Sequence, residues 1–349
     1  MPMIRRFLAF FLILPLLSGC GSGSEQPDNL IEKNLNEITA AKTPFALAKT
    51  ATPVLTTSDW DAIFGGSSGT ELKFDRFGEV DELVFVAVKG TFFQLQRQIR
   101  RQTRAGLETI YFKVTTPSYT GPEELWIDGR FLDLRDVRPA EELEKASIAK
   151  TMIRVRSFSG QPYTWHGSSS TGVPELLKYY PPKESLTPRL ENDWILKGFS
   201  SLGMLYEASG GQTPLSEADL ASFGQAVFAD LDSLELEKET SEKTDDGIIR
   251  AKEVEDKNMQ KTKAFIKLLK PLDIIQMGER IWIVLDDQEV IEARYRSKFA
   301  GKVEITPLLD TLHGLLGKAT LVEDPLAELK DKSIQTFFIR RFADFTIQH

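Results

Sequence analysis

The only cysteine of this chain lies at position 20, directly after an apolar segment, and this restricts how the protein can be stabilised. Among 349 residues, Cys20 alone carries a thiol. Arg5 and Arg6 precede an apolar run over 7–17, a pattern typical of a secretory signal and too short for a lasting transmembrane span. The exported chain therefore forms no internal disulfide and no cysteine-ligated zinc site, and it depends on a hydrophobic core.

The end of this segment carries a processing motif. Residues 17–20 read Leu-Ser-Gly-Cys and resemble the lipobox of bacterial lipoproteins, in which the cysteine becomes the lipidated first residue. The resemblance implies a signal peptide over 1–19, lipidation (palmitate or a similar acyl chain) at Cys20, and membrane attachment through this N-terminal lipid. Gly21 stands where an aspartate would mark inner-membrane retention. We therefore expect a lipid-anchored protein of the cell envelope, at the outer membrane and facing the periplasm.

Composition indicates an ordinary globular protein without a bulk affinity for nucleic acid. The chain has 43 Lys+Arg against 51 Asp+Glu, a formal charge of −8, so it lacks the basic excess that neutralises phosphates. Apolar residues make up 41% of the sequence. The length predicts two domains, each able to bury a core.

The first half reads as a tether followed by a small β-domain. Residues 20–50 contain the lipidated cysteine, a Gly/Ser tether and a short amphipathic helix expected around 30–41. Within 51–140, short β-branched or aromatic runs between Gly and Pro turns predict strands at 84–88, 110–114 and 124–134. Leu125-Trp126-Ile127 resembles the closing strands of bacterial SH3-like domains, which implies a small β-barrel. Arg97, Arg100, Arg101 and Arg104 fall at helical spacing.

Four elements of the second half carry a family resemblance. In chain order they are Pro162-Tyr163-Thr164-Trp165-His166-Gly167, the run Gly198 to Ala208, the run Leu269 to Ile275, and the two runs 280–285 and 290–293. They resemble the NlpC family of papain-like cell-wall peptidases, whose members carry Pro-Tyr-x-Trp-Gly-Gly, Gly-Phe-Asp-Cys-Ser-Gly-Leu, Pro-Gly-Asp-Leu and a His-Val-x-Ile strand. The resemblance implies an NlpC-like domain over 141–349.

The overall expectation is an α+β protein. A small SH3-like β-barrel is followed by a papain-like NlpC-type domain, in which the nucleophile-position helix packs on an antiparallel sheet. The sequence departs from the family by a longer insertion over 173–197, by a charged insertion at about 230–263, expected to form an exposed helical arm or loop, and by Leu272 at a family glycine.

The resemblance also shows which catalytic groups are replaced. Ser201 stands at the position of the nucleophilic cysteine, Arg280 at that of the histidine base, and Glu292 at that of the orienting residue; Ser200 replaces the preceding aspartate. A serine hydroxyl needs a base to remove its proton. Arginine is protonated at physiological pH and has no acceptor, so it cannot be that base. We therefore expect no catalytic residues here.

Three functions remain open at this point. The first is a pseudoenzyme that binds a peptidoglycan stem peptide or an envelope protein, with Tyr163, Trp165, His166, Ser200 and Ser201 as binding residues. The second is an active serine-type peptidase of γ-D-glutamyl-diamino-acid bonds, in which Ser201 acts with His166 as substitute base. The third is a purely structural envelope component. No cofactor and no metal site are expected, because no cluster of His, Asp or Glu has ligand spacing.

Arg280 and Glu292 give a geometric expectation. They lie twelve residues apart on two strands joined by a turn at 286–288, and an odd loop length places both side chains on one face of the hairpin. We therefore predict that the two residues form a charge pair behind Ser201.

Overall fold

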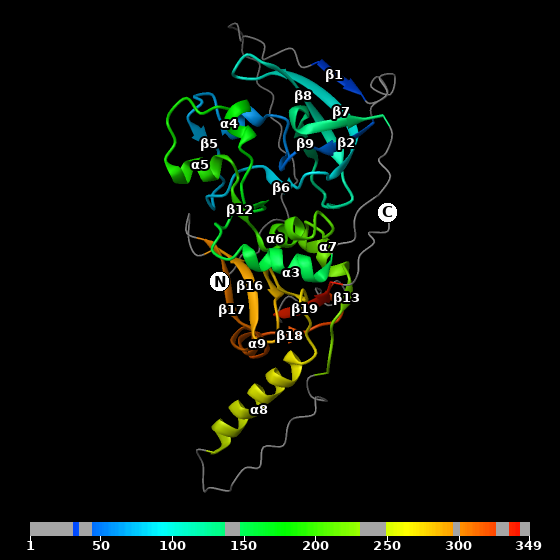
Figure 1. The fold of residues 1–349 in the computed structure, drawn as a ribbon, viewed down its shortest axis with the longest axis vertical. Helices are drawn as coiled ribbons and strands as arrows, with labels where there is room; N and C mark the ends of the chain where they lie inside the picture. The colour runs from blue at the N-terminus through cyan, green and yellow to red at the C-terminus, as the bar shows by residue number, and fades with distance from the viewer. Residues whose placement is uncertain are drawn as a thin grey trace, which may run out of the picture.

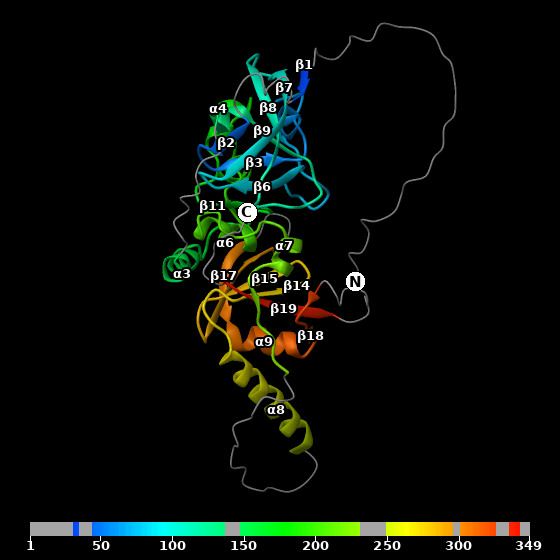
Figure 2. The ribbon, with the colours of Figure 1, turned by 90° about the vertical axis from the view of Figure 1, so that its right-hand side faces the viewer.

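The computed structural model describes residues 31–34, 44–136, 147–230, 249–295, 301–325 and 335–342. Its elements are stacked along the long axis: a curled sheet, a layer of short helices, a second sheet and two further helices (Figure 1, Figure 2). Both large sheets are mainly antiparallel, and the class is α+β, as the sequence predicts. The signal segment with Cys20 lies outside the described residues.

The first sheet has eight strands and curls on itself. The order is β10-β2-β7-β8-β9-β3-β6, and β1 pairs with β7. The bounds are β1 Ile31–Asn34, β2 Phe45–Ala48, β3 Thr52–Leu55, β6 Leu83–Ala87, β7 Phe92–Gln102, β8 Glu108–Thr115, β9 Leu125–Asp128 and β10 Leu132–Arg135. Three short elements accompany them: α2 Trp60–Ile63, the hairpin of β4 Phe64–Gly65 and β5 Glu71–Leu72, and the 3-10 turn η1 Gly129–Phe131.

The predicted strands of this half are confirmed, and two helical expectations are wrong. Strands β6 and β8 lie at the first two predicted runs, and β9 and β10 occupy the third on either side of the 3-10 turn at 129–131. Residues 31–34, expected in a helix, form strand β1, and the rest of that expected helix lies outside the described residues. The arginines at apparent helical spacing lie on β7 and the turn after it, because Phe93, Leu95 and Ile99 are buried at alternate positions.

The middle layer consists of short segments between the two sheets. Its helices are α3 Ile148–Ser157, α4 Glu175–Tyr179, α5 Pro188–Trp194, α6 Ser201–Ala208 and α7 Glu217–Ser222, and its two short strands are β11 Ser168–Ser169 and β12 Gly198–Phe199. Side chains of Ser147, Thr187 and Ser216 cap three of these helices. The apolar residues at 148, 152 and 155 lie at helical spacing and predict a helix over 140–155; α3 overlaps this run and ends two residues later. Residues 137–146 are outside the described part.

The second sheet lies between this layer and the last helices. Its order is β13-β19-β14-β15-β16-β17, and β18 pairs with β19 in parallel. The bounds are β13 Gln225–Ala226, β14 Ile274–Met277, β15 Arg280–Val284, β16 Glu289–Arg294, β17 Lys302–Pro307, β18 Thr320–Leu321 and β19 Thr336–Arg341; the helices are α8 Ile249–Ile266 and α9 Leu308–Leu316. Helix α8 occupies part of the charged insertion and projects from the body (Figure 1).

The two faces of this sheet pack on different helices. Ile281, Ile283 and Ile291 join Leu202 and Leu205 of α6 in one core cluster. The alternate residues Trp282, Val284 and Val290 join Leu308 and Leu312 of α9 in another. This alternation fixes which side chains of β15 and β16 face α6.

The insertion over 173–197 packs onto the first sheet. Leu176, Tyr180 and Trp194 are buried in the same core cluster as Trp60 and the strands of that sheet. Its helices α4 and α5 lie beside the curled sheet in Figure 1. The core of the first half is therefore completed by residues from the second half of the sequence.

Candidate functional site

Helix α6 begins at Ser201, and the two serines at its start each hold a backbone N–H. Ser200 is the N-cap, and its Oγ accepts a hydrogen bond from Gly203 N at 3.1 Å. The Oγ of Ser201 accepts a hydrogen bond from Ala293 N at 3.0 Å. Both hydroxyl oxygens are therefore used by the scaffold.

The Ser201 hydroxyl lies where strands β15 and β16 separate. Pairing between these strands reaches Ile291 and does not continue to Ala293. On its other side, Ala293 is opposite Val303 of β17. The backbone N–H and C=O of Val303 point away from Ala293 and form hydrogen bonds with Gln161 and Gly160. The N–H of Ala293 thus has no strand acceptor, and Ser201 supplies one.

Replacing Ser201 with alanine is expected to lower the free energy of unfolding by about 1–3 kcal/mol, because the Ala293 N–H would lose its acceptor in a poorly hydrated position. Urea unfolding measures this loss. The matched control is Ser222→Ala at the exposed end of α7, where the expected change is at most about 0.5 kcal/mol. Equal losses in the two variants would contradict a scaffold role for the Ser201 hydroxyl.

Arg280 and Glu292 form the predicted charge pair. Arg280 Nη2 donates to Glu292 Oε2 at 2.9 Å and to Oε1 at 3.3 Å. The Glu292 side chain is 5% exposed, while that of Arg280 is 49% exposed. The Arg280 guanidinium also lies 4.4 Å above the centre of the Trp282 ring. The pairing is confirmed, but its predicted place behind Ser201 is wrong, because Arg280 and Glu292 share the sheet face of Trp282 and Val290, which packs on α9.

The pair lies on the face of the sheet opposite to α6. Trp282, under the Arg280 guanidinium, belongs to the cluster around α9, and Glu292 follows Val290 of that cluster at a two-residue interval. Ser201 belongs to the α6 side. Neither Arg280 nor Glu292 is therefore placed to exchange a proton with the Ser201 hydroxyl.

Three glycines bring the motif segments into direct contact. A Cβ on Gly203 would lie 1.8 Å from the carbonyl oxygen of Gly167, and one on Gly167 would lie 2.7 Å from that of Gly198. A Cβ on Gly198 would lie 2.5 Å from the Pro162 carbonyl oxygen. The Pro162–Gly167 segment, strand β12 and helix α6 therefore interlock at positions where the family motifs also have glycine.

Two further positions have a backbone that glycine favours, although neither is glycine. His166 has φ 55° and Leu272 has φ 68°, both in the left-handed region. These are the positions at which the compared motifs have the first glycine of Trp-Gly-Gly and the glycine of Pro-Gly-Asp-Leu. His166 and Leu272 thus have a backbone conformation that glycine adopts more easily.

The His166 imidazole is directed at the first sheet. Its ring stacks on Trp165 with centroids 4.7 Å apart, and Nδ1 lies 3.0 Å from the carbonyl oxygen of Leu83 in β6. Burial lowers the pKa of His166, so we assign a neutral ring whose Nδ1–H donates to Leu83. Within the described part of the chain, no hydrogen bond joins His166 to Ser201. His313 lies on α9, beyond the second sheet.

Tyr163 lies where several carboxylates from different elements converge. The charges of Glu79, Glu279 and Glu217 add to burial in raising its pKa. These residues come from the loop after β5, the β14–β15 turn and the start of α7. The Tyr163 ring lies 5.7 Å from that of Tyr295. No sequence pattern indicates this cluster, because its members are far apart along the chain.

Because of the carboxylates around Tyr163, we expect the folded protein to become less stable as the pH rises. Burial, followed by the charges of Asp75 and Glu279, raises the pKa of Glu79 from 4.5 to about 7. Between these values the native state holds a proton that the unfolded chain has released, so the melting temperature should decrease from pH 5 to pH 8. Glu79→Gln should flatten this dependence, whereas Glu108→Gln, at an exposed strand end, should leave it unchanged. A Glu79→Gln profile parallel to wild type would contradict the assignment.

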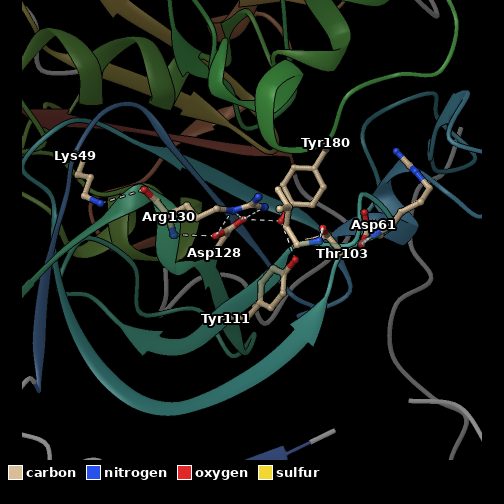
Figure 3. A network of polar contacts seen from close by, with 9 residues as sticks. Lys49, Asp61, Thr103, Tyr111, Asp128, Arg130 and Tyr180 are labelled. Atoms are coloured by element: carbon tan, nitrogen blue, oxygen red, sulfur yellow. Dashed lines mark hydrogen bonds and ion pairs between the residues drawn. The ribbon is translucent and has the colours of Figure 1, made fainter. Parts of the chain in front are cut away.

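A buried polar network joins the 173–197 segment to the first sheet (Figure 3). Asp128 is fully buried and accepts hydrogen bonds from Arg130 Nε at 2.9 Å and Nη2 at 2.5 Å. Its Oδ2 also accepts the Tyr180 hydroxyl at 2.6 Å. The hydroxyls of Tyr180 and Tyr111 lie 2.9 Å apart. This network holds α4 on the strands, and no motif in the sequence indicates it.

One hollow lies at the outer edge of the second sheet. Its volume is about 450 Å³, and its lining residues are Ser159, Gly160, Arg294 and 302–306. Ser201 is not among them. Across the described residues, no group of three His, Cys, Asp or Glu side chains is arranged to hold a metal ion. No helix in that part of the chain combines the length and apolarity needed to span a bilayer.

Comparison of the chain with protein-family models, with curated proteins and with solved structures finds no match.

Proposed function

We propose that this protein is a lipid-anchored envelope protein with an SH3-like domain and a degenerate NlpC-like domain that binds a partner without cleaving it. The ligand class is a peptidoglycan stem peptide or an envelope protein. The interlocked Gly167, Gly198 and Gly203 support the likeness, since they explain why three motif segments have glycine at these positions. The left-handed backbone of His166 and Leu272 supports it at two substituted positions.

One observation supports the proposal that this protein does not cleave its ligand. The Ser201 hydroxyl accepts a backbone N–H, and the two charged side chains that the resemblance aligns with the base and the orienting residue are paired with each other on the opposite sheet face, out of reach of this hydroxyl. General-base activation of a hydroxyl requires an acceptor within hydrogen-bond reach. The Arg280 guanidinium has no acceptor atom, and it is bound to Glu292.

The test is to incubate the mature protein with soluble disaccharide-tetrapeptide, following cleavage by mass spectrometry and binding by calorimetry. Saturable binding without cleavage of the γ-D-glutamyl-diamino-acid bond is the expected result. Turnover that is lost in Ser201→Ala would instead assign the serine-type peptidase. If neither cleavage nor binding is seen, and envelope cross-linking with the chain in place captures no partner, the protein is a structural component and the proposal is wrong.

The lipid anchor is tested separately, by metabolic labelling with a fatty-acid analogue. We expect labelled wild-type protein in the outer-membrane fraction and an unlabelled, released Cys20→Ser variant. A labelled Cys20→Ser protein would overturn the anchor at this residue.

A further inference from the structure

The chain enters the fold beside the turn of the β7–β8 hairpin. Strand β1 pairs antiparallel with β7; its first residue, Ile31, is opposite Arg100, and its last is opposite Arg97. Because β7 runs toward the turn at 103–107, the first residue of β1 is the one nearest to this turn. The segment that leads back to Cys20 therefore starts at the hairpin turn.

This turn lies at the end of the molecule opposite to α8. Thr91, just before β7, has its Oγ1 2.7 Å from the Tyr206 hydroxyl of α6 in the middle layer. The eleven residues of β7 lead away from that layer, and β1, β7 and β8 lie at one end of the long axis with α8 at the other (Figure 1, Figure 2). Cys20 is eleven residues before Ile31, a span of at most about 40 Å. A lipid on Cys20 therefore holds the hairpin end near the bilayer.

The turn presents an apolar side chain on a backbone that is already ordered. Leu107 is 55% exposed, and its neighbours Ala105 and Gly106 are exposed as well. Buried Thr103 accepts hydrogen bonds from Gly106 N at 2.7 Å, through its carbonyl oxygen, and from Leu107 N at 3.2 Å, through Oγ1. The Leu107 side chain can thus enter the interfacial region of a bilayer without further ordering of the backbone.

The basic side chains near the turn differ in how they are held. The Arg104 guanidinium donates to three backbone carbonyl groups, and Arg101 lies 3.5 Å from Asp59. Arg100 pairs with Glu108 at 3.3 Å, and these two side chains are 49% and 67% exposed. Solvent screens an exposed pair, so Arg100 can exchange this carboxylate for a lipid phosphate at little cost. The turn therefore offers one apolar side chain and one exchangeable cation, not a basic patch.

We propose that the turn 103–107 docks on the phospholipid leaflet that carries the lipid anchor, with Leu107 inserted among the headgroups and Arg100 at a phosphate. The proposal rests on the lipid proposed at Cys20. This anchor keeps the turn at a high effective concentration beside the bilayer, so a weak contact suffices. In the docked protein the second sheet and α8 point away from the membrane, which leaves the NlpC-like half accessible to its ligand.

A bilayer fits this turn better than a folded partner. One exposed leucine and one exchangeable cation cover far less area than a stable interface between proteins requires. A second copy of the chain would have to bind through the same small surface without the help of a tether. The leaflet is already brought to the turn by the anchor.

Coupling the mature chain through Cys20 to a maleimide lipid tests docking independently of lipidation in the cell, because this cysteine is the only one in the sequence. Hydrogen exchange is compared between protein coupled to vesicles of phosphatidylethanolamine and phosphatidylglycerol and protein blocked with N-ethylmaleimide. On vesicles we expect at least about fivefold slower exchange over 104–108 and unchanged exchange in α8. Leu107→Ser should remove this protection, whereas Ile153→Ser, at a 67% exposed position on α3, should retain it.

Arg100→Gln tests the cation and should reduce the protection by about half or more. Its matched control is Arg135→Gln, because Arg135 is 50% exposed and also pairs with one carboxylate. Arg135 is opposite Phe45 of β2, which is in turn opposite Gln94 of β7, so it lies well away from the turn. Arg135→Gln should leave the protection unchanged.

Unchanged exchange over 104–108 on vesicles, or equal effects of Leu107→Ser and Ile153→Ser, would overturn the docking whatever metabolic labelling shows for Cys20. Protection that increases with the density of protein on the vesicle would assign the turn to a second copy instead. A protein that docks after coupling but is not lipidated in cells would refute the anchor, and the docking in the cell with it.

Discussion

Asp128→Ala is expected to lower the free energy of unfolding by about 3 kcal/mol or more. The carboxylate is fully buried and accepts hydrogen bonds from Arg130 and from the Tyr180 hydroxyl. Its removal leaves the guanidinium, which is only 21% exposed, without its counter-charge. It also removes the link between Tyr180 and the first sheet, so hydrogen exchange should increase in helices α4 and α5.

The chain contains a matched control for this change. Asp133 and Arg135 form the same i, i+2 ion pair on β10, the next strand along the chain, with side chains 47% and 50% exposed. Asp133→Ala should cost at most about 1 kcal/mol, because solvent screens the pair. Tyr180→Phe keeps the Asp128–Arg130 pair and should cost about 1 kcal/mol, the typical value of a hydrogen bond. If Asp128→Ala and Asp133→Ala lower the free energy of unfolding equally, the expectation that the buried pair is the more costly one to break is wrong.

Local patterns allowed four of the eight strands of the first sheet to be predicted, β6, β8, β9 and β10, but neither the other four nor the complete core. Runs such as 110–114 are β-branched and bounded by turn residues, so their strands follow from the sequence alone. Tyr180 and Trp194 lie in a Pro-rich insertion with no strand or helix periodicity, and their burial against Trp60 depends on contacts over more than a hundred residues. Strand β7 was obscured because its arginines interrupt the alternation of Phe93, Leu95 and Ile99.

The candidate site shows the same limit. The residue parity of the 280–292 hairpin correctly predicted that Arg280 and Glu292 pair, since parity decides whether two side chains share a face. Parity does not determine which face of the sheet receives α6. That choice depends on the packing of Ile281, Ile283 and Ile291 against the helix, which places the charge pair on the other side. The carboxylates around Tyr163 were missed because three separate elements supply them.

Gly203→Ala is expected to have an effect as large as that of Asp128→Ala, for a steric reason. The added methyl carbon would lie 1.8 Å from the Gly167 carbonyl oxygen, 2.7 Å from its carbon and 3.0 Å from Ser168 Cβ. The first two of these are backbone atoms, so a side-chain rotation cannot relieve the contact. Helix α6 has to move away from the 167–168 segment, at an expected cost of about 3 kcal/mol or more.

The control is Gly314→Ala in helix α9, where a Cβ meets no atom within 4 Å. This variant should gain about 0.5–1 kcal/mol, because alanine is the better helix former. The two changes are chemically identical and differ only in what surrounds the new methyl group. Displacement of α6 also moves Ser201 away from the Ala293 N–H, so this amide should exchange faster in Gly203→Ala than in wild type. A Gly203→Ala protein as stable as Gly314→Ala would show that α6 and the 167–168 segment are not in contact.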